Sequence, residues 1–359
     1  SSAASDVYKR QITLQEAKRA TELRGNMLVR MHREQKTGRS VCFLCGVRIT
    51  HRNRSEEHVV PKWVLRRFNL WDASITLLNG HRLPYRRLTI PCCRTCNSVH
   101  LARIERDVQR AVTEGFEGVD QLDRETLFLW LGKVFYGLLY RENLMHRDPS
   151  GRRRGRLVPR AFLQAFETHH QFLQGIRLPV RWVTPIPASI LVVPVQSPAS
   201  PEHRFDLRDS PFAMTISMRL GDVGIIAALH DGGAQRDKFF PLLERYRKHP
   251  LHPLQFVELS AEFFYKVSLA RRFPSFATIG TPDEVSVMQI PWTPDPNHWA
   301  PWNDKEYAVL LSRYTGFPAE WFFDPDRGLR GFLKDEAGLA RWLPLSELPW
   351  PVDRVTLMP

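Results

Sequence analysis

The sequence has no apolar run long enough to cross a membrane. The nearest candidate, residues 126–140 (TLFLWLGKVFYGLLY), is shorter than the ~20 residues that a spanning helix needs, and it contains Lys133. The N-terminal residues also lack the apolar core of a secretory signal. We therefore interpret residues 126–140 as a buried core helix and predict a cytoplasmic location.

Acidic residues are scarce in the first third of the chain. Residues 1–110 contain 22 Lys and Arg but only 9 Asp and Glu, whereas the remainder has 29 of each sign. The whole net charge of +13 therefore belongs to this segment. Arginine dominates it, and the planar guanidinium suits phosphate. The charge predicts attraction of a polyanion such as nucleic acid, although a solvated basic surface would have the same composition.

Cysteine is confined to one short region. The five cysteines, at 42, 45, 92, 93 and 96, form two tight groups, whereas a secreted disulfide framework would spread them along the chain. Two Cys-x-x-Cys pairs can place four thiolates around one zinc ion, and we assign them as Cys42, Cys45, Cys93 and Cys96. Cys92 remains an alternative to Cys93. A closed shell of four sulfurs predicts a structural zinc site.

The remaining patterns predict a mixed α+β fold. We interpret residues 1–11 (SSAASDVYKRQ) as a non-native leader, 12–115 as a basic helix (14–35) followed by the cysteine-bearing module, and 120–359 as an accessory domain. Further helices are expected at about 97–113, 124–145, 158–174, 235–248, 261–272 and 304–314. Strands are expected at 189–196, 212–219, 222–230, 255–260 and 284–290.

Three motifs follow one another in the cysteine-bearing region. They are CFLCG at 42–46, EEHVVP at 56–61 and CRTCN at 93–97. In this order and spacing they resemble the zinc-containing HNH endonucleases of the ββα-metal fold. The resemblance covers about residues 40–110, and it implies a hairpin followed by a helix.

The resemblance also implies roles for individual residues. His58 would be the general base that activates water for attack on phosphorus. Glu57 and Asn97 would hold one Mg²⁺ or Mn²⁺ ion, with His100 as a further candidate ligand. The implied activity is phosphodiester hydrolysis, with double-stranded DNA as the expected substrate and defence as a role by analogy. The candidate phosphate-binding residues are Arg52, Arg54, Arg66, Arg67, Arg86, Arg87 and Arg94.

The sequence departs from the family pattern at the central Asn. The position where the family has this Asn, which fixes the loop of the base, is Arg87 here. Asn79, Thr89 or a backbone carbonyl are the alternatives for this role. The acidic residue before His58 is Glu in place of Asp, which shifts the expected ion position.

A non-catalytic reading of the same motifs is also open. In it, the zinc-stabilised module binds nucleic acid through its basic surface, and His58 only packs and forms hydrogen bonds. We interpret His51 and His81 as loop residues and Glu105 as a solvated helix residue.

Overall fold

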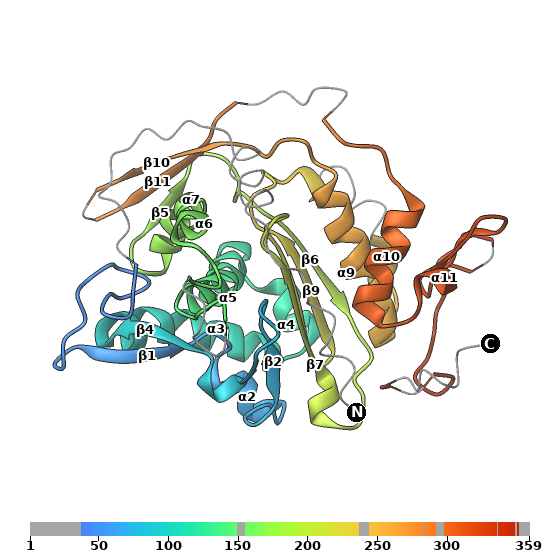
Figure 1. Ribbon diagram of the computed structural model, residues 1–359, viewed down its shortest axis with the longest axis horizontal. Coiled ribbons are helices and arrows are strands. Elements are labelled where there is room, and N and C mark those ends of the chain that lie inside the picture. Colours follow the sequence, from blue (N-terminus) through green and yellow to red (C-terminus); the bar gives the residue numbers. More distant parts are fainter. Residues whose placement is uncertain are drawn as a thin grey trace.

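A four-stranded antiparallel sheet stands between two groups of helices (Figure 1). The computed structural model describes residues 37–148, 155–236, 244–281, 283–291, 298–335, 337–348 and 350–351, so the predicted leader and the predicted helix at 14–35 lie outside it. The strand order of the sheet is β6 (Ser189–Pro194), β9 (Val223–Ala228), β8 (Thr215–Leu220) and β7 (Phe205–Ser210).

Alternate residues of this sheet belong to two separate hydrophobic clusters. On β6, Ile190 and Val192 join the first cluster, whereas Leu191 and Val193 join the second. Successive side chains of a strand point to opposite faces, so the sheet is buried on both sides. This is why β6 and β9, at one side of the sheet, read as apolar runs instead of an alternating pattern.

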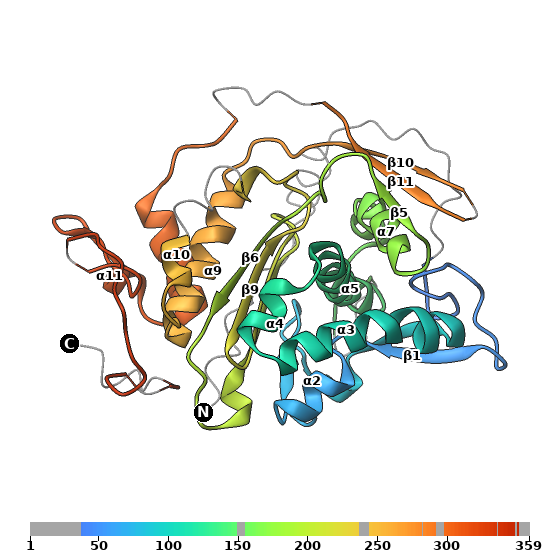
Figure 2. The same ribbon diagram turned by 180° about the vertical axis from the view of Figure 1, so that it is seen from behind.

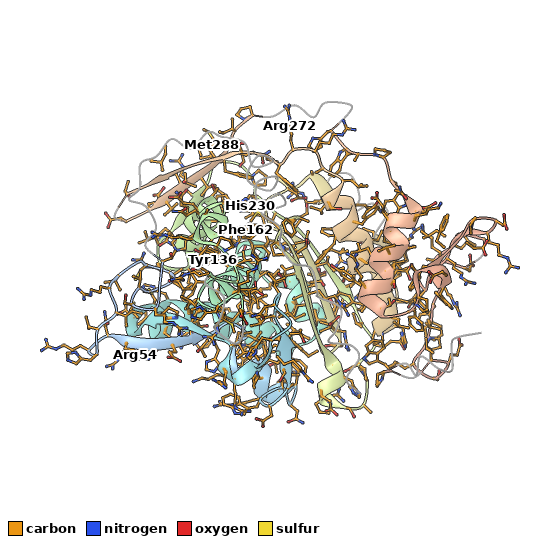
Figure 3. The ribbon with its side chains drawn as sticks, viewed as in Figure 1. Arg54, Tyr136, Phe162, His230, Arg272 and Met288 are labelled. Atoms are coloured by element: carbon orange, nitrogen blue, oxygen red, sulfur yellow. The ribbon has the colours of Figure 1, made fainter. Side chains whose placement is uncertain are left out.

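The first cluster lies under the helices that follow the cysteine region. Its centre is α5 (Arg124–Asn143), which begins after Asp123, whose carboxylate accepts a hydrogen bond of 2.8 Å from the backbone N–H of Thr126. Tyr136 of α5 lies in the interior, whereas Arg54 points outward (Figure 3). Around α5 pack α3 (Ala102–Thr113), α4 (Phe116–Gln121), α6 (Arg160–Gln164), α7 (Glu167–Phe172) and η4 (Leu173–Ile176).

The second cluster lies on the opposite face of the sheet. It contains α9 (Pro253–Ser268), against which α10 (Asp304–Thr315) packs, and it reaches α11 (Ala319–Phe322) (Figure 2). The first cluster runs from Cys42 to Val287, so residues on both sides of the predicted boundary at 115–120 share one core.

Smaller strands and turns complete the fold. β5 (Val180–Trp182) pairs in parallel with β11 (Val285–Gln289), which pairs antiparallel with β10 (Phe276–Gly280). The other small elements are η5 (Pro201–Arg204), η6 (Glu244–Arg247) and the hairpins β2 (Ser74–Thr76) with β3 (Arg82–Pro84) and β12 (Phe323–Asp324) with β13 (Gly328–Leu329).

Most predicted elements occur, with one clear error, and the helix predicted at 235–248 lies partly outside the described residues. The strand predicted at 255–260 lies inside helix α9, whose first turn is capped by His252. A short continuous apolar run fits a buried helix as well as a buried strand, and α9 is buried along nearly its whole length. The helix predicted at 158–174 is divided into α6 and α7, and β7 and β10 were not predicted. Among the described residues, no helix combines the length and apolarity needed to span a membrane.

Candidate metal centre and the His58 site

The four cysteines assigned from spacing come together at one end of a two-stranded antiparallel sheet. Their sulfur atoms all lie within 4.8 Å of one another. Cys42 and Cys45 belong to a tight turn, in which the backbone N–H of Gly46 donates to the carbonyl of Cys42 at 3.0 Å and Gly46 has a φ of +70°. Cys93 ends β4 (Thr89–Cys93), and Cys96 begins the π-helical turn η3 (Cys96–Leu101).

This arrangement fits a zinc ion. A tetrahedral site with Zn–S bonds of about 2.3 Å has sulfur atoms about 3.8 Å apart. The distance between the sulfur atoms of Cys45 and Cys93 is 3.8 Å. The sulfur of Cys92 lies 3.9 Å from that of Cys42. The group of four sulfurs that all lie close to one another nevertheless includes Cys93 and not Cys92. Hydrogen bonding with Cys42 raises the pKa of Cys45 to about 11, whereas a divalent ion would stabilise the thiolates.

A pair of strands separates the cysteines from His58. Strand β1 (Arg54–His58) pairs antiparallel with β4, so that Arg54 lies opposite Cys93 and His58 opposite Thr89. Four residues of strand separate these two ends, a distance of about 13 Å. A metal held by the four cysteines would therefore fix this pair of strands without reaching the histidine. The predicted helix at 97–113 follows as η3 and α3.

Asn97 is held against strand β1. Its amide nitrogen donates to the hydroxyl of Ser55 at 2.8 Å and to the carbonyl of Glu56 at 2.9 Å. Because Asn97 directly follows Cys96, a metal bound by the cysteines would fix the turn from which it reaches the strand. Both hydrogen bonds use the nitrogen, so neither of them engages the carboxamide oxygen.

Glu57 faces a buried lysine. Its side chain, in a residue only 4% exposed, forms an ion pair with Lys133 of α5. The ammonium of Lys133 also contacts Glu105 at 3.0 Å and donates to the backbone carbonyl of His58 at 2.9 Å. Lys133 thus connects α5, α3 and the end of β1. The sequence signal for it was the one charged residue inside the apolar stretch 126–140.

The charges of this triad are mutually dependent. Burial raises the pKa of Glu57 to about 7; the nearby Glu105 adds to the rise, and Lys133 opposes it. The two carboxylates raise the pKa of Lys133 above that of a free lysine, although burial acts in the opposite direction. We conclude that Lys133 stays charged, because one ammonium serves two carboxylates.

His58 is half-buried and packs against an aromatic ring. Its ring stacks on Trp71, with ring centroids 6.1 Å apart and an angle of 23° between the planes. The backbone of Arg86 lies near the ring and acts to raise the pKa of His58, but other causes outweigh it. Burial, followed by the positive charges of Lys62 and Lys133, lowers its pKa. The neutral ring that this favours donates from one nitrogen and can accept a proton at the other.

The residues considered for the family's central Asn occupy different places. Asn79 donates to the carbonyl of His146 at 3.2 Å and accepts from the N–H of His81 at 3.1 Å, in the turn between β2 and β3. The hydroxyl of Thr89 donates to Glu56 at 3.1 Å. Arg86, whose backbone lies near His58, belongs to the short turn η2 (Tyr85–Arg87).

The remaining candidates lie on the surface around this site. All seven predicted arginines are exposed; Arg54 pairs with Glu56 at 3.4 Å, and Arg86 pairs with Asp72. His51 and His81 are also exposed. His100 is partly buried, and its pKa is lowered by burial and by the charges of Arg177 and Arg103. These neighbours are cationic, so they do not make His100 a better metal ligand.

Within the described residues, the four cysteines are the one group of His, Cys, Asp and Glu side chains close enough to share an ion. Comparisons with family models, with curated proteins and with solved structures find no match to this chain.

Proposed function

We propose that the chain is a metal-dependent endonuclease of the HNH type that hydrolyses phosphodiester bonds, with DNA as its substrate. The observation that carries the proposal is the contact of Asn97 with strand β1. Asn97 contacts Ser55 and Glu56, which precede it by 42 and 41 positions in the sequence. These two residues come directly before Glu57 and His58 on the strand. A purely structural zinc module has no need of this contact.

The state of His58 supports a role as general base. A base must be neutral to accept a proton from water, and the lowered pKa of His58 keeps it neutral at neutral pH. Stacking on the ring of Trp71 restricts the orientation of the imidazole. The free nitrogen would take the proton of the water that attacks phosphorus.

The donor chemistry near His58 also fits a hard divalent ion. The contact with Lys133 uses Oε1 of Glu57, which leaves Oε2, and Asn97 keeps its carboxamide oxygen. Oxygen ligands of this kind suit Mg²⁺ or Mn²⁺. Such an ion would stabilise the negative charge that develops on the phosphate. The exposed arginines on this side would attract the backbone of the nucleic acid.

Incubation with supercoiled plasmid and Mg²⁺ or Mn²⁺ tests the proposal. We expect nicking by the wild type, and loss of at least about 100-fold in rate for His58→Ala, since general-base catalysis contributes about that much or more. Asn97→Ala should also lose activity. Arg313→Gln, a surface change on α10, is the matched control. Cleavage by folded His58→Ala at the wild-type rate would refute the assignment.

A second candidate function is a zinc-stabilised module that binds nucleic acid without cutting it. The buried ion pair of Glu57 with Lys133 favours it, because an ammonium already neutralises the expected metal ligand. Both functions predict binding that weakens with salt. Binding without divalent-dependent cleavage of duplex DNA, single strands or RNA would favour this second candidate.

A further inference from the structure

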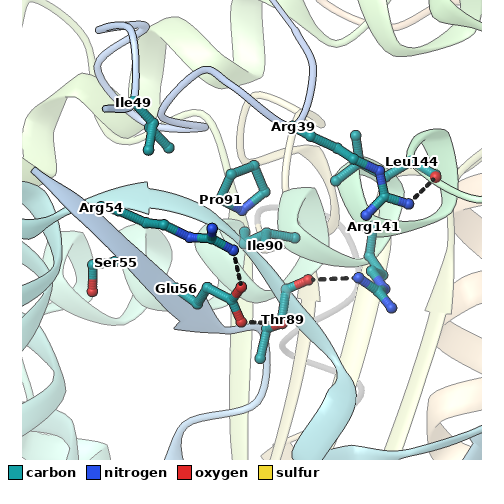
Figure 4. Close-up of a pocket in the computed structure, with 10 residues that line it drawn as sticks. All are labelled: Arg39, Ile49, Arg54, Ser55, Glu56, Thr89, Ile90, Pro91, Arg141 and Leu144. Carbon is teal, nitrogen blue, oxygen red and sulfur yellow. Dashed lines mark hydrogen bonds and ion pairs between the residues drawn. The ribbon is translucent and has the colours of Figure 1, made fainter. Parts of the chain in front are cut away.

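A small cationic pocket opens beside strand β1. It has a volume of about 120 Å³, and it lies between the strands β1 and β4, the end of α5 and the segment before Cys42 (Figure 4). Its lining residues are Arg39, Ile49, Arg54, Ser55, Glu56, Thr89, Ile90, Pro91, Arg141 and Leu144. Three arginines therefore face a single carboxylate.

The arginines of this pocket come from three separate segments. Arg39 precedes the metal centre and donates to the carbonyl of Leu144 at 3.1 Å. Arg141, near the end of α5, donates to the carbonyl of Thr89 at 3.2 Å. Arg54 contacts Glu56 at 3.4 Å. The fold thus gathers like charges that would repel one another in the absence of an anion.

One guanidinium in the pocket has an unmet donor. The Nε atom of Arg141 is buried and has no hydrogen-bond partner among the described residues. The positive charges of Arg39 and Arg87, together with burial, lower the pKa of Arg141, and only Glu56 acts in the opposite direction. An oxyanion held between the guanidinium groups would offset this repulsion.

The size of the pocket limits its occupant. Sites for whole organic ligands measure about 300–1,000 Å³, so this one suits a single small group. Phosphate is the anion whose oxygens match several guanidinium donors at once. The pocket is also close to His58: Glu56 and His58 lie two residues apart on β1, about 6.6 Å, and share one face of the strand.

We propose that the pocket of Arg39, Arg54 and Arg141 binds a phosphate group of the nucleic-acid strand. This phosphate would be the neighbour, along the strand, of the phosphate that faces His58. This inference rests on the proposed nuclease function. The same chemistry would accept an internal phosphodiester, a terminal phosphate or free orthophosphate. Binding here would position the strand and would leave the chemical step to the His58 site.

Binding measurements without added divalent ions separate this proposal from catalysis. The probes are orthophosphate, followed by thermal shift, and a 3′-fluorescein-labelled single strand with either a 5′-phosphate or a 5′-hydroxyl, followed by anisotropy. The proteins are wild type, Arg39→Gln, Arg141→Gln, Glu56→Gln and the control Arg313→Gln. Arg39 is exposed, so its variant should fold even if Arg141→Gln does not.

The variants should change affinity in opposite directions. We expect Arg39→Gln and Arg141→Gln to weaken strand binding about tenfold and to reduce the steepness of its salt dependence, because each removes one charged contact to phosphate. Glu56→Gln should strengthen binding several-fold, because it removes the one negative charge of the pocket. Arg313→Gln should behave as the wild type.

The two strands distinguish the sources of the phosphate. If the arginine variants lose affinity only for the 5′-phosphorylated strand, the pocket binds a terminal phosphate. If they lose affinity equally for both strands, the pocket binds an internal phosphate. Either result supports the proposal. Unchanged strand affinity in these variants would overturn it, including when orthophosphate still stabilises the protein. Normal binding together with failure of cleavage would overturn the nuclease function and leave the pocket intact.

Discussion

At the residue scale, the neighbours of His58 set the pH at which it can act as a base. Lys62 is exposed, and its positive charge contributes to the lowered pKa of His58. If the base must be neutral, activity rises with pH through this pKa. The acidic limb of the profile should therefore lie below the ordinary histidine value of about 6.5.

Substitution of Lys62 tests this electrostatic effect. In Lys62→Gln the pKa of His58 should rise, because a repelling charge is lost, and the acidic limb of the kcat/KM profile should move to higher pH by a few tenths of a unit. Lys248→Gln, an exposed change remote from β1, is the control. An unmoved limb would mean that the titrating group is not His58.

Lys133 is the residue with the largest expected effect on stability. Lys133→Met leaves Glu57 and Glu105 without their cation, and loss of one partner of a buried ion pair costs about 3–5 kcal/mol. We expect the free energy of unfolding, measured by urea denaturation at pH 7, to fall by that amount. The loss should shrink as pH falls and the carboxylates become neutral. Lys305→Met, at an exposed position, should change little.

At the scale of elements, the cysteine cluster joins the pair of strands β1 and β4 to α3. A metal bound by Cys42, Cys45, Cys93 and Cys96 would hold the ends of β4 and η3 together. We expect one zinc ion per chain by metal analysis. Removal of the metal by a chelator should lower the melting temperature and abolish the spatial relation of Asn97 to β1.

The two adjacent cysteines offer a matched comparison. Cys93→Ser should lose zinc and stability, because it removes one of the four mutually close sulfurs, whereas Cys92→Ser should retain the metal. Metal content of the two purified variants is the measurement. If Cys93→Ser keeps zinc and Cys92→Ser loses it, Cys92 is the ligand in place of Cys93.

The sequence predicted the elements that have strong local signals. Paired cysteine spacing located the metal cluster, and Asp123 marked the start of α5. The pattern failed at residues 255–260, where an apolar run carries no period that separates a strand from a buried helix. It also gave no partner for Lys133, since ion pairs across about 75 residues depend on packing and leave no local trace.

At the scale of the whole molecule, one polar contact region connects α5 to the central sheet. Glu142, near the end of α5, is 7% exposed and accepts a hydrogen bond from the N–H of Leu78 at 3.3 Å. Burial, together with the charge of Asp209 on β7, raises the pKa of Glu142 to about 8, and burial raises that of Asp209 to about 7. The fold therefore favours the neutral forms of both carboxyls.

This arrangement gives the stability of the protein a defined pH dependence. Both pKa values lie above their unfolded values, so the neutral carboxyls stabilise the fold at low pH, and this contribution is lost as pH rises through about 4 to 8. Glu142→Gln keeps the acceptor for Leu78 and cannot ionise. Its stability advantage over the wild type should grow by about 4 kcal/mol between pH 5 and pH 8.5, because the pKa of Glu142 is raised by about 3.5 units and each unit is worth about 1.4 kcal/mol.

Thermal unfolding of wild type and Glu142→Gln across pH 5 to 8.5 measures this difference. The exposed Glu320→Gln controls for the change in net charge. A stability difference that widens with pH means that ionisation of the buried Glu142 carboxyl destabilises the fold. A stability difference between the two proteins that does not change with pH would mean that a cation compensates the charge of Glu142. The pKa of Glu142 would then not be raised.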